Sequence, residues 1–163
     1  MTASARILAA VALLDPKPGE HLLEIGCGTG QAIEAILARR PDVFVTAIDR
    51  SEKAVARARA VNAEAIAAGR AKVSLGDVES GPMPAGPFDR VFAIRVNSFW
   101  TKPGLALTQV KAALAPGGEF WMIYDERADK VVGPILASLS TFGPCHIRDA
   151  EGPEAFAVIA RFG

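Results

Sequence analysis

The 163-residue sequence is poor in metal-binding and cross-linking residues, with two cysteines, Cys27 and Cys145, and two histidines, His21 and His146. No two of these residues have the close spacing that structural zinc sites use, so the sequence predicts no metal site. Cys27 lies inside a glycine-rich turn that a cross-link would obstruct. We therefore expect both cysteines to be free thiols.

The sequence also has no excess of charge of either sign, because 18 Lys and Arg residues balance 18 Asp and Glu residues. Proteins that bind nucleic acid by neutralising phosphates carry a basic surplus or a clustered basic face, whereas the arginines here are scattered. Nucleic acid is therefore disfavoured as a partner. The charge pattern also gives no polybasic signal for a membrane surface.

Long hydrophobic runs are absent as well, so no transmembrane segment is predicted. The apolar run at 7–14 follows Arg6 but is short, lacks a clear cleavage site and continues into Asp15-Pro16. Its apolar residues fall at helical spacing, which predicts an amphipathic helix rather than a secretory signal. We expect a cytoplasmic protein without a membrane partner.

The length and composition favour one globular domain over residues 1–163, in which residues 1–20 form an N-terminal helix and linker. Apolar residues make up 50% of the chain and charged residues 22%, which is ordinary for a soluble protein with a sizeable core. Apolar runs alternate with helical segments, the pattern of a parallel sheet covered on both faces.

The most informative segment is an apolar run that ends in three alternate glycines, Gly26, Gly28 and Gly30. Glycine lets a chain leave a buried strand in a tight turn and brings backbone N–H groups close to a ligand. Dinucleotide folds use the spacing G-x-G-x-x-G, which would require glycine where this chain has Gln31. The spacing here is G-x-G-x-G, with Glu24 two residues before the first glycine.

Acidic residues follow the next two predicted strands. Asp49 ends the run 43–48, where a carboxylate can accept both hydrogen bonds of a ribose diol. Asp77 follows the run 72–75. A glycine turn without a ligand is the alternative, but suitable groups at three successive strand ends favour a nucleotide-type ligand.

These residues closely resemble the first motifs of class I S-adenosylmethionine (SAM) dependent methyltransferases. Two later stretches extend the resemblance. Phe88-Asp89-Arg90-Val91 is similar to the family's "FD.V" strand, and the stretch 114–122 with Pro116-Gly117-Gly118 is similar to its "L.PGG.(L/F)" connection to the fifth strand. The second stretch also reads as a plain helix stop, and both readings can hold.

The resemblance implies an α/β fold: a doubly wound, seven-stranded, mostly parallel sheet in the order 3-2-1-4-5-7-6, with strand 7 antiparallel and helices on both faces. It implies in-line transfer of the SAM methyl group to a small-molecule acceptor, leaving S-adenosylhomocysteine, with no metal. The family's SAM contacts carry over to the following positions: Glu24 (methionine amino group), Gly26, Cys27, Gly28 and Gly30 (methionine and ribose), Asp49 (ribose hydroxyls), Arg50, Asp77 and Val78 (adenine), and Arg95 (methionine carboxylate). For Arg50 and Arg95, a solvated arginine is the alternative.

No catalytic residue stands out, because a methyl group on a positive sulfur needs mainly alignment. Acceptor-side candidates are Asn97, Trp100 and Tyr124, with Phe99 and Trp100 equally suited to covering the core. The stretch 97–100 partly resembles the (D/N)PPY motif of nucleobase methyltransferases, but both prolines are missing. Further possible bases are Asp125, Glu126 and His146, each of which also reads as an ordinary structural residue.

Local signals predict the remaining elements. We expect helices over 31–40, 51–69, 103–115 and 129–141, the last interrupted at Gly133-Pro134, a loop over 79–87, and a terminal hairpin of strands 145–148 and 155–162. Because only about 20 residues precede the first motif, we expect the acceptor side to be open or closed by a partner subunit in a homo-oligomer.

Two rival functions remain from the sequence. A SAM-binding scaffold or regulatory protein would keep Asp49 and Asp77 without methylating anything. A dinucleotide-dependent oxidoreductase also uses a glycine turn and an acid after the second strand, but Gln31 argues against it.

Overall fold

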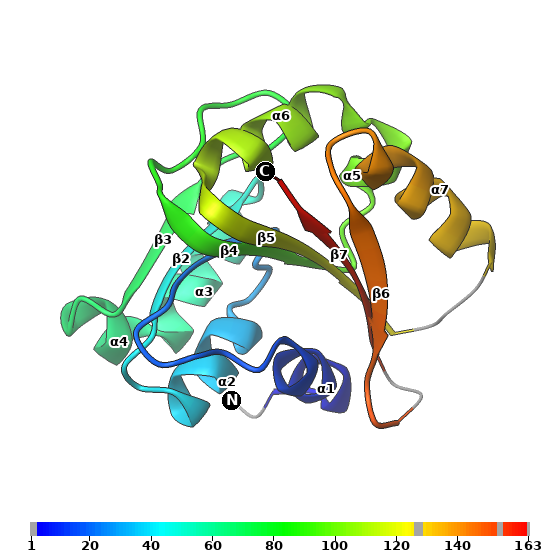
Figure 1. Cartoon of the computed structure of the whole chain (residues 1–163). Coiled ribbons are helices and arrows are strands. Elements are labelled where there is room, and N and C mark those ends of the chain that lie inside the picture. The colour runs from blue at the N-terminus through cyan, green and yellow to red at the C-terminus, as the bar shows by residue number, and fades with distance from the viewer. Residues whose placement is uncertain (1–2, 126–128, 153–154, 163) are drawn as a thin grey trace.

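A seven-stranded sheet forms the centre of the protein, in a computed structural model that describes residues 3–125, 129–152 and 155–162 (Figure 1). The strand order is β3-β2-β1-β4-β5-β7-β6. β7 is antiparallel to β5 and β6, and the other neighbouring pairs are parallel. The predicted fold class and strand order are confirmed. The strands are β1 (His21–Ile25), β2 (Phe44–Asp49), β3 (Ala71–Leu75), β4 (Phe88–Ile94), β5 (Leu114–Tyr124), β6 (Cys145–Asp149) and β7 (Phe156–Arg161).

Helices cover both faces of the sheet, as Figure 1 shows. Successive strand residues point to opposite faces, so Leu22 packs in one core and Leu23 in the other. The first core contains residues of α1, α2, α3 and α4, and the second contains residues of α5, α6 and α7. The helices are α1 (Ala5–Leu14), α2 (Gln31–Arg39), α3 (Glu52–Val61), α4 (Ala63–Ala67), α5 (Ser98–Thr101), α6 (Pro103–Ala113) and α7 (Asp129–Ser140).

The single helix predicted over 51–69 is wrong, because the chain breaks at Asn62 into α3 and α4. The start is as expected, since the Ser51 hydroxyl accepts from the Ala54 N–H at 3.2 Å. The Asn62 side chain is 4% exposed and donates to the carbonyls of Ala58 and Gly30, both at 3.0 Å. Its hydrogen bonds to the backbone compete with a regular helix.

Two further boundaries differ from the predictions. α7 runs through Gly133-Pro134 without the expected interruption, because Val132, Ile135 and Leu139 are buried along one face against the second core. α6 ends at Ala113, and the Pro116-Gly117-Gly118 stretch lies within β5, where the pairing with β4 shifts register. The short helix α5 was not predicted, whereas residues 79–87 contain no helix, as expected.

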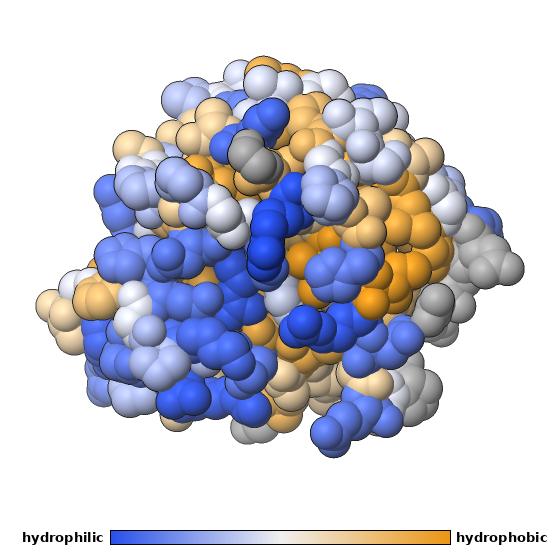
Figure 2. Space-filling model, viewed as in Figure 1, coloured by the Kyte–Doolittle hydropathy of each residue, from blue (hydrophilic) through white to orange (hydrophobic). Residues whose placement is uncertain are grey.

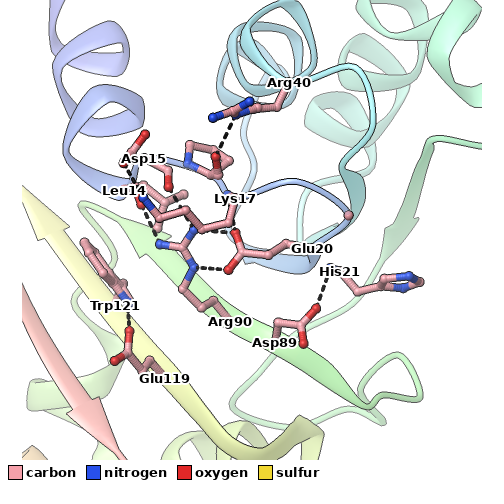
Figure 3. Close-up of polar contacts among 12 residues, drawn as sticks. Leu14, Asp15, Lys17, Glu20, His21, Arg40, Asp89, Arg90, Glu119 and Trp121 are labelled. Carbon is pink, nitrogen blue, oxygen red and sulfur yellow. Dashed lines mark hydrogen bonds and ion pairs between the residues drawn. The ribbon is translucent and has the colours of Figure 1, made fainter.

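Polar side chains fix the amino ends of the strands (Figure 3). Arg90 is 6% exposed, donates through Nε and Nη2 to the Glu20 carboxylate, and donates through Nη1 to the Leu14 carbonyl. Its guanidinium lies 5.2 Å from the centre of the Trp121 ring. Asp89, the other polar residue of the FD.V-like stretch, accepts from the His21 N–H at 2.8 Å. These two residues therefore join α1, its linker, β1 and β4.

The surface is divided between a polar and a more apolar region. In the view of Figure 2, hydrophilic residues cover the left side, where Figure 1 places α3 and α4. Hydrophobic residues reach the surface on the right, near α7 and β6, which carry the half-buried Leu136 and Ile147. No helix in the described part of the chain is both long and apolar enough to cross a bilayer.

Candidate functional site

A cavity of about 530 Å³ opens at the carboxyl ends of β1, β2, β3 and β4. The strand order reverses between β1 and β4, and ligands of open α/β sheets bind beside such a reversal. Several residues predicted from the sequence line this cavity: Gly26, Asp49, Arg50, Asp77, Val78, Arg95 and Asn97. The wall does not include Glu24, Cys27, Gly28, Gly30, Trp100 or Tyr124.

The glycine turn is fastened to the end of β2. The N–H groups of Gly26 and Cys27 both donate to the Ile48 carbonyl, at 2.9 and 3.0 Å, and the Gly28 N–H donates to Asp49 Oδ2 at 2.9 Å. Gly26 has φ +75°, and a Cβ there would lie 2.8 Å from Val96 Cγ2. A Cβ on Gly28 would meet no described atom within 4 Å, although φ is +54°. The turn therefore leaves open space above Gly28 for a ligand.

At Gly30, in contrast to Gly28, an added Cβ would collide with neighbouring protein atoms. A Cβ there would lie 2.9 Å from Ala58 Cα and 2.6 Å from Asn62 Nδ2, so only glycine allows α2 to begin this close to α3. The Asn62 hydrogen bond to the Gly30 carbonyl fixes the same approach. Gly30 thus shapes the turn by helix packing.

Two carboxylates stand at neighbouring strand ends of the cavity. Asp49 accepts from the Gly28 N–H through Oδ2 and from the Ser51 N–H through Oδ1, each at 2.9 Å. Asp77 Oδ1 accepts from the Glu79 N–H at 2.9 Å. A carboxylate offers about four lone-pair sites, so both groups keep acceptor capacity for ligand hydroxyl or amino groups.

Glu24 is an acidic group enclosed by protein. Its side chain is 2% exposed, and its Oε2 has no hydrogen-bond partner within residues 3–125, 129–152 and 155–162. Burial, and secondarily repulsion from Asp49, raises the pKa of the Glu24 carboxyl to about 8. A buried polar atom without a partner is costly, and such an atom next to the glycine turn calls for an explanation.

Cys27 is free, as is Cys145, in agreement with the prediction. Burial, followed by the charges of Glu24 and Asp49, raises the pKa of the Cys27 thiol to about 12. Cys27 therefore stays a neutral thiol at physiological pH and is not a nucleophile.

The two arginines at the cavity are ion-paired at its rim. Arg50 is 74% exposed and lies 3.9 Å from the Glu79 carboxylate. Arg95 has the left-handed φ of 61°, and its Nε lies 3.2 Å from Asp125 Oδ1. Asp125 also meets Arg6 of α1 at 3.4 Å. Asp125 is thus held between two arginines.

The acceptor-side candidates differ in whether they reach the cavity. Asn97 lines the cavity, whereas Phe99 is fully buried and packs edge-on against Phe120, so its core interpretation is confirmed. Trp100 Nε1 donates to the Tyr124 hydroxyl at 3.1 Å, and that hydroxyl donates to the Val96 carbonyl at 2.7 Å.

Burial raises the pKa of Tyr124 to about 12, so its phenol remains protonated at neutral pH. His146 lies on β6, at the end of the sheet, while the cavity lies at β1 to β4. Glu126 lies outside the described residues. In the described part of the chain, no group of three side chains has the makeup of a metal site.

A family model described as "Methyltransferase domain" matches residues 22–118, more than half of the chain. The chain belongs to this family. The solved structures that share the fold of this protein include SAM-dependent methyltransferases. The resemblance found in the sequence is thereby confirmed.

Individual relatives of this methyltransferase domain include proteins named as O-methyltransferases. The nocamycin O-methyltransferase of Saccharothrix syringae is 42% identical over 149 residues, covering 89% of this chain and 51% of the relative. The O-methyltransferase cnsE of Penicillium expansum is 35% identical over 126 residues, covering 76% of this chain and 45% of the relative. The chain spans about half the length, or less, of the curated relatives it matches.

Solved structures show the same fold at low identity. A SAM-dependent methyltransferase from Mesorhizobium loti has a TM-score of 0.72 and 20% identity, with 97% of this chain and 98% of that chain covered. The [4+2]-cyclase SpnF has a TM-score of 0.75 and 20% identity, with 96% of this chain and 80% of that chain covered. Proteins with this fold therefore carry out more than one kind of chemistry, so the function has to be argued from the residues of the site.

Sequence reasoning missed two polar residues of this methyltransferase domain that hold its loops. Gln109 on α6 donates to the Val78 carbonyl at 2.7 Å, and Asn62 holds the glycine turn as described. Asn62 had one local signal, since asparagine is unfavourable inside an alanine-rich helix. Gln109 had none, because glutamine is an ordinary helix residue.

Proposed function

We propose that this domain transfers the methyl group of SAM to a small-molecule acceptor, leaving S-adenosylhomocysteine. The observation that carries the proposal is the cavity beside the strand-order reversal, whose wall brings together Gly26, Asp49 and Asp77 at successive strand ends. The buried Glu24 Oε2, which lacks a partner among the described residues, supports it, because a cationic amino group with N–H donors would satisfy this atom and stabilise its charged form. The methionine part of SAM carries such a group.

The remaining proposed contacts follow the strand ends. The free acceptor sites of Asp49 take the ribose hydroxyls, and the open space above Gly28 admits the ligand beside bare backbone. Asp77 and the Val78 N–H read the adenine edge. Arg50 lies along the adenine, and Arg95 faces the methionine carboxylate from the rim.

Bound SAM supplies a methyl group already activated by its positive sulfur. The domain's own residues then orient the two reactants and exclude water, which can supply up to ~7–11 kcal/mol of a barrier. The acids of the cavity are already engaged, Asp49 and Asp77 with backbone amides and Glu79 with Arg50. Asn97 lines the cavity beside Ser98, Thr101 and Lys102 and is the side chain we assign to orienting an acceptor; we assign no general base.

The names of the relatives support hydroxyl compounds as the first acceptors to screen, because two of them are O-methyltransferases. We further infer a cytoplasmic protein whose acceptor side is either open or closed by a partner subunit of a homo-oligomer. Gel filtration with and without S-adenosylhomocysteine tests the oligomer, and a monomer under both conditions contradicts it.

Calorimetric titration with SAM, S-adenosylhomocysteine and NADH, after removal of copurified ligand, tests the function. We expect micromolar binding of the first two and none of NADH. Binding of NADH alone, or of none of the three, overturns the proposal. SAM binding without turnover across a panel of hydroxyl acceptors favours the scaffold alternative.

A further inference from the structure

Two loops that line the cavity each accept a hydrogen bond from a side chain that does not itself line the cavity. Gln109 Nε2 on α6 donates to the Val78 carbonyl, in the loop after β3, and the Tyr124 hydroxyl at the end of β5 donates to the Val96 carbonyl, in the loop after β4. Both distances are 2.7 Å. Val78 and Val96 themselves line the cavity.

The loop after β3 depends on such support because residues 76–87 contain no helix or strand. Within the loop, the Asp77 carbonyl accepts from the Ser80 and Gly81 N–H groups, which shapes the turn. The Gly76 N–H, which donates to the Asp49 carbonyl at 3.0 Å, and the Glu79–Arg50 ion pair connect the loop to the end of β2. The Gln109 hydrogen bond joins the loop to α6, whose buried Leu107 and Val110 pack in the second core. The helix thereby sets the position of Asp77 and Val78.

The loop after β4 is held at the opposite end of the cavity. Tyr124 accepts from Trp100 Nε1 of α5 while donating to the Val96 carbonyl, so its hydroxyl joins the loop to α5. Val96 in turn packs against the glycine turn, since its Cγ2 lies 2.8 Å from the position of a Cβ on Gly26. A shift of Val96 therefore changes the space at Gly26 directly.

We infer that Gln109 and Tyr124 are positioning residues that act separately, Gln109 on the adenine end and Tyr124 on the methionine end of the SAM site. The inference rests on the proposed function, which assigns these two ends. It assigns Tyr124 to holding the site and not to accepting a proton. Each hydrogen bond holds one loop in its binding shape before the ligand arrives, which lowers the cost of binding.

Calorimetry with two ligands, S-adenosylhomocysteine and adenosine, tests this assignment. Gln109→Met keeps a similar length without the donor, and Tyr124→Phe removes only the hydroxyl. We expect Gln109→Met to weaken both ligands by roughly 3- to 10-fold, the factor for one hydrogen bond. We expect Tyr124→Phe to weaken S-adenosylhomocysteine by a similar factor and to leave adenosine within about twofold of wild type, because adenosine lacks the methionine part.

Thr108→Ala is the matched control, because Thr108 lies beside Gln109 on α6 and its exposed hydroxyl bonds to Gly104 within the helix. It should leave both affinities unchanged. If thermal unfolding shows that Gln109→Met is not folded, Gln109→Leu, which also cannot donate, replaces it.

The outcomes separate the two proposals. If the wild type binds S-adenosylhomocysteine, the positioning roles alone are overturned when Gln109→Met binds both ligands normally. They are also overturned when Tyr124→Phe binds both ligands normally or weakens both equally. A wild-type protein that binds no S-adenosylhomocysteine overturns the proposed function, and the positioning roles with it.

Discussion

Replacing Glu24 with glutamine should make the protein more stable and a poorer SAM binder. The pKa of the Glu24 carboxyl is about 8 in the folded protein, against an ordinary value of 4.5. An unfolded chain loses this proton near pH 4.5, whereas the folded protein keeps it until about pH 8. The free energy of unfolding therefore falls as the pH rises between these two values.

The size of this change in the free energy of unfolding follows from the pKa shift of Glu24. Each pKa unit corresponds to ~1.4 kcal/mol, so the ionised Glu24 carboxylate disfavours the folded state by ~4–5 kcal/mol above pH 8. Glu24→Gln keeps the shape of the side chain and cannot ionise. The variant and wild type should have nearly equal stability at pH 5, and the variant should be more stable at pH 8.5 by up to that amount.

Ligand binding should change in the opposite direction. A neutral amide gives up the charge-assisted hydrogen bond to the ligand amino group, worth ~1.5–3 kcal/mol, so S-adenosylhomocysteine affinity should fall roughly 10- to 100-fold. Wild-type binding at pH 7 also requires Glu24 to lose its proton. The affinity of the wild type should therefore rise towards pH 8, and that of the variant should stay flat.

Urea unfolding at pH 5 and 8.5 measures the stabilities, and calorimetry in two buffers of different ionisation enthalpy measures affinity and the protons released. Glu64→Gln is the control, because Glu64 is exposed on α4. Equal or lower stability of Glu24→Gln at pH 8.5, or wild-type affinity for S-adenosylhomocysteine in the variant, would refute the reasoning.

Three further substitutions test other parts of the structure. Asp49→Ala should weaken S-adenosylhomocysteine binding roughly 10- to 100-fold in calorimetry, and unchanged affinity in a folded variant would contradict the ribose assignment. Gly30→Ala should lower the free energy of unfolding by ~1–3 kcal/mol in urea, because φ is +83° and the new Cβ would approach Ala58 Cα to 2.9 Å; an unchanged midpoint would refute the packing argument. Arg90→Met should lower it by ~3–5 kcal/mol by leaving the Glu20 carboxylate without its buried partner, and thermal unfolding close to wild type would contradict this.

Much of the site could be predicted because its chemistry is local in the chain. The alternate glycines, Asp49 and Asp77 each follow a strand directly, and the carboxyl ends of parallel strands meet at one edge. The strand order came from the resemblance to a family and not from periodicity. The same local signals gave the caps at Ser51 and the loop at 79–87.

Predictions failed where packing outweighed local preference. Gly133-Pro134 is a helix-breaking pair, but the buried face of α7 keeps the helix intact. Asn62 stands in a sequence that favours one long helix, but its side chain finds a partner at Gly30 and divides the helix.

The sequence by itself indicated a nucleotide-type ligand and determined the glycine turn and the strand-end carboxylates that we propose bind it, because these depend on neighbours along the chain. Only the tertiary structure decided which residues hold the site, because their partners are distant: Asn62 bonds to Gly30 across 32 positions, Gln109 to Val78 across 31, and Arg90 to Glu20 across 70. It also decided that Glu24 is buried with an elevated pKa, because desolvation is set by every element packed around the carboxyl.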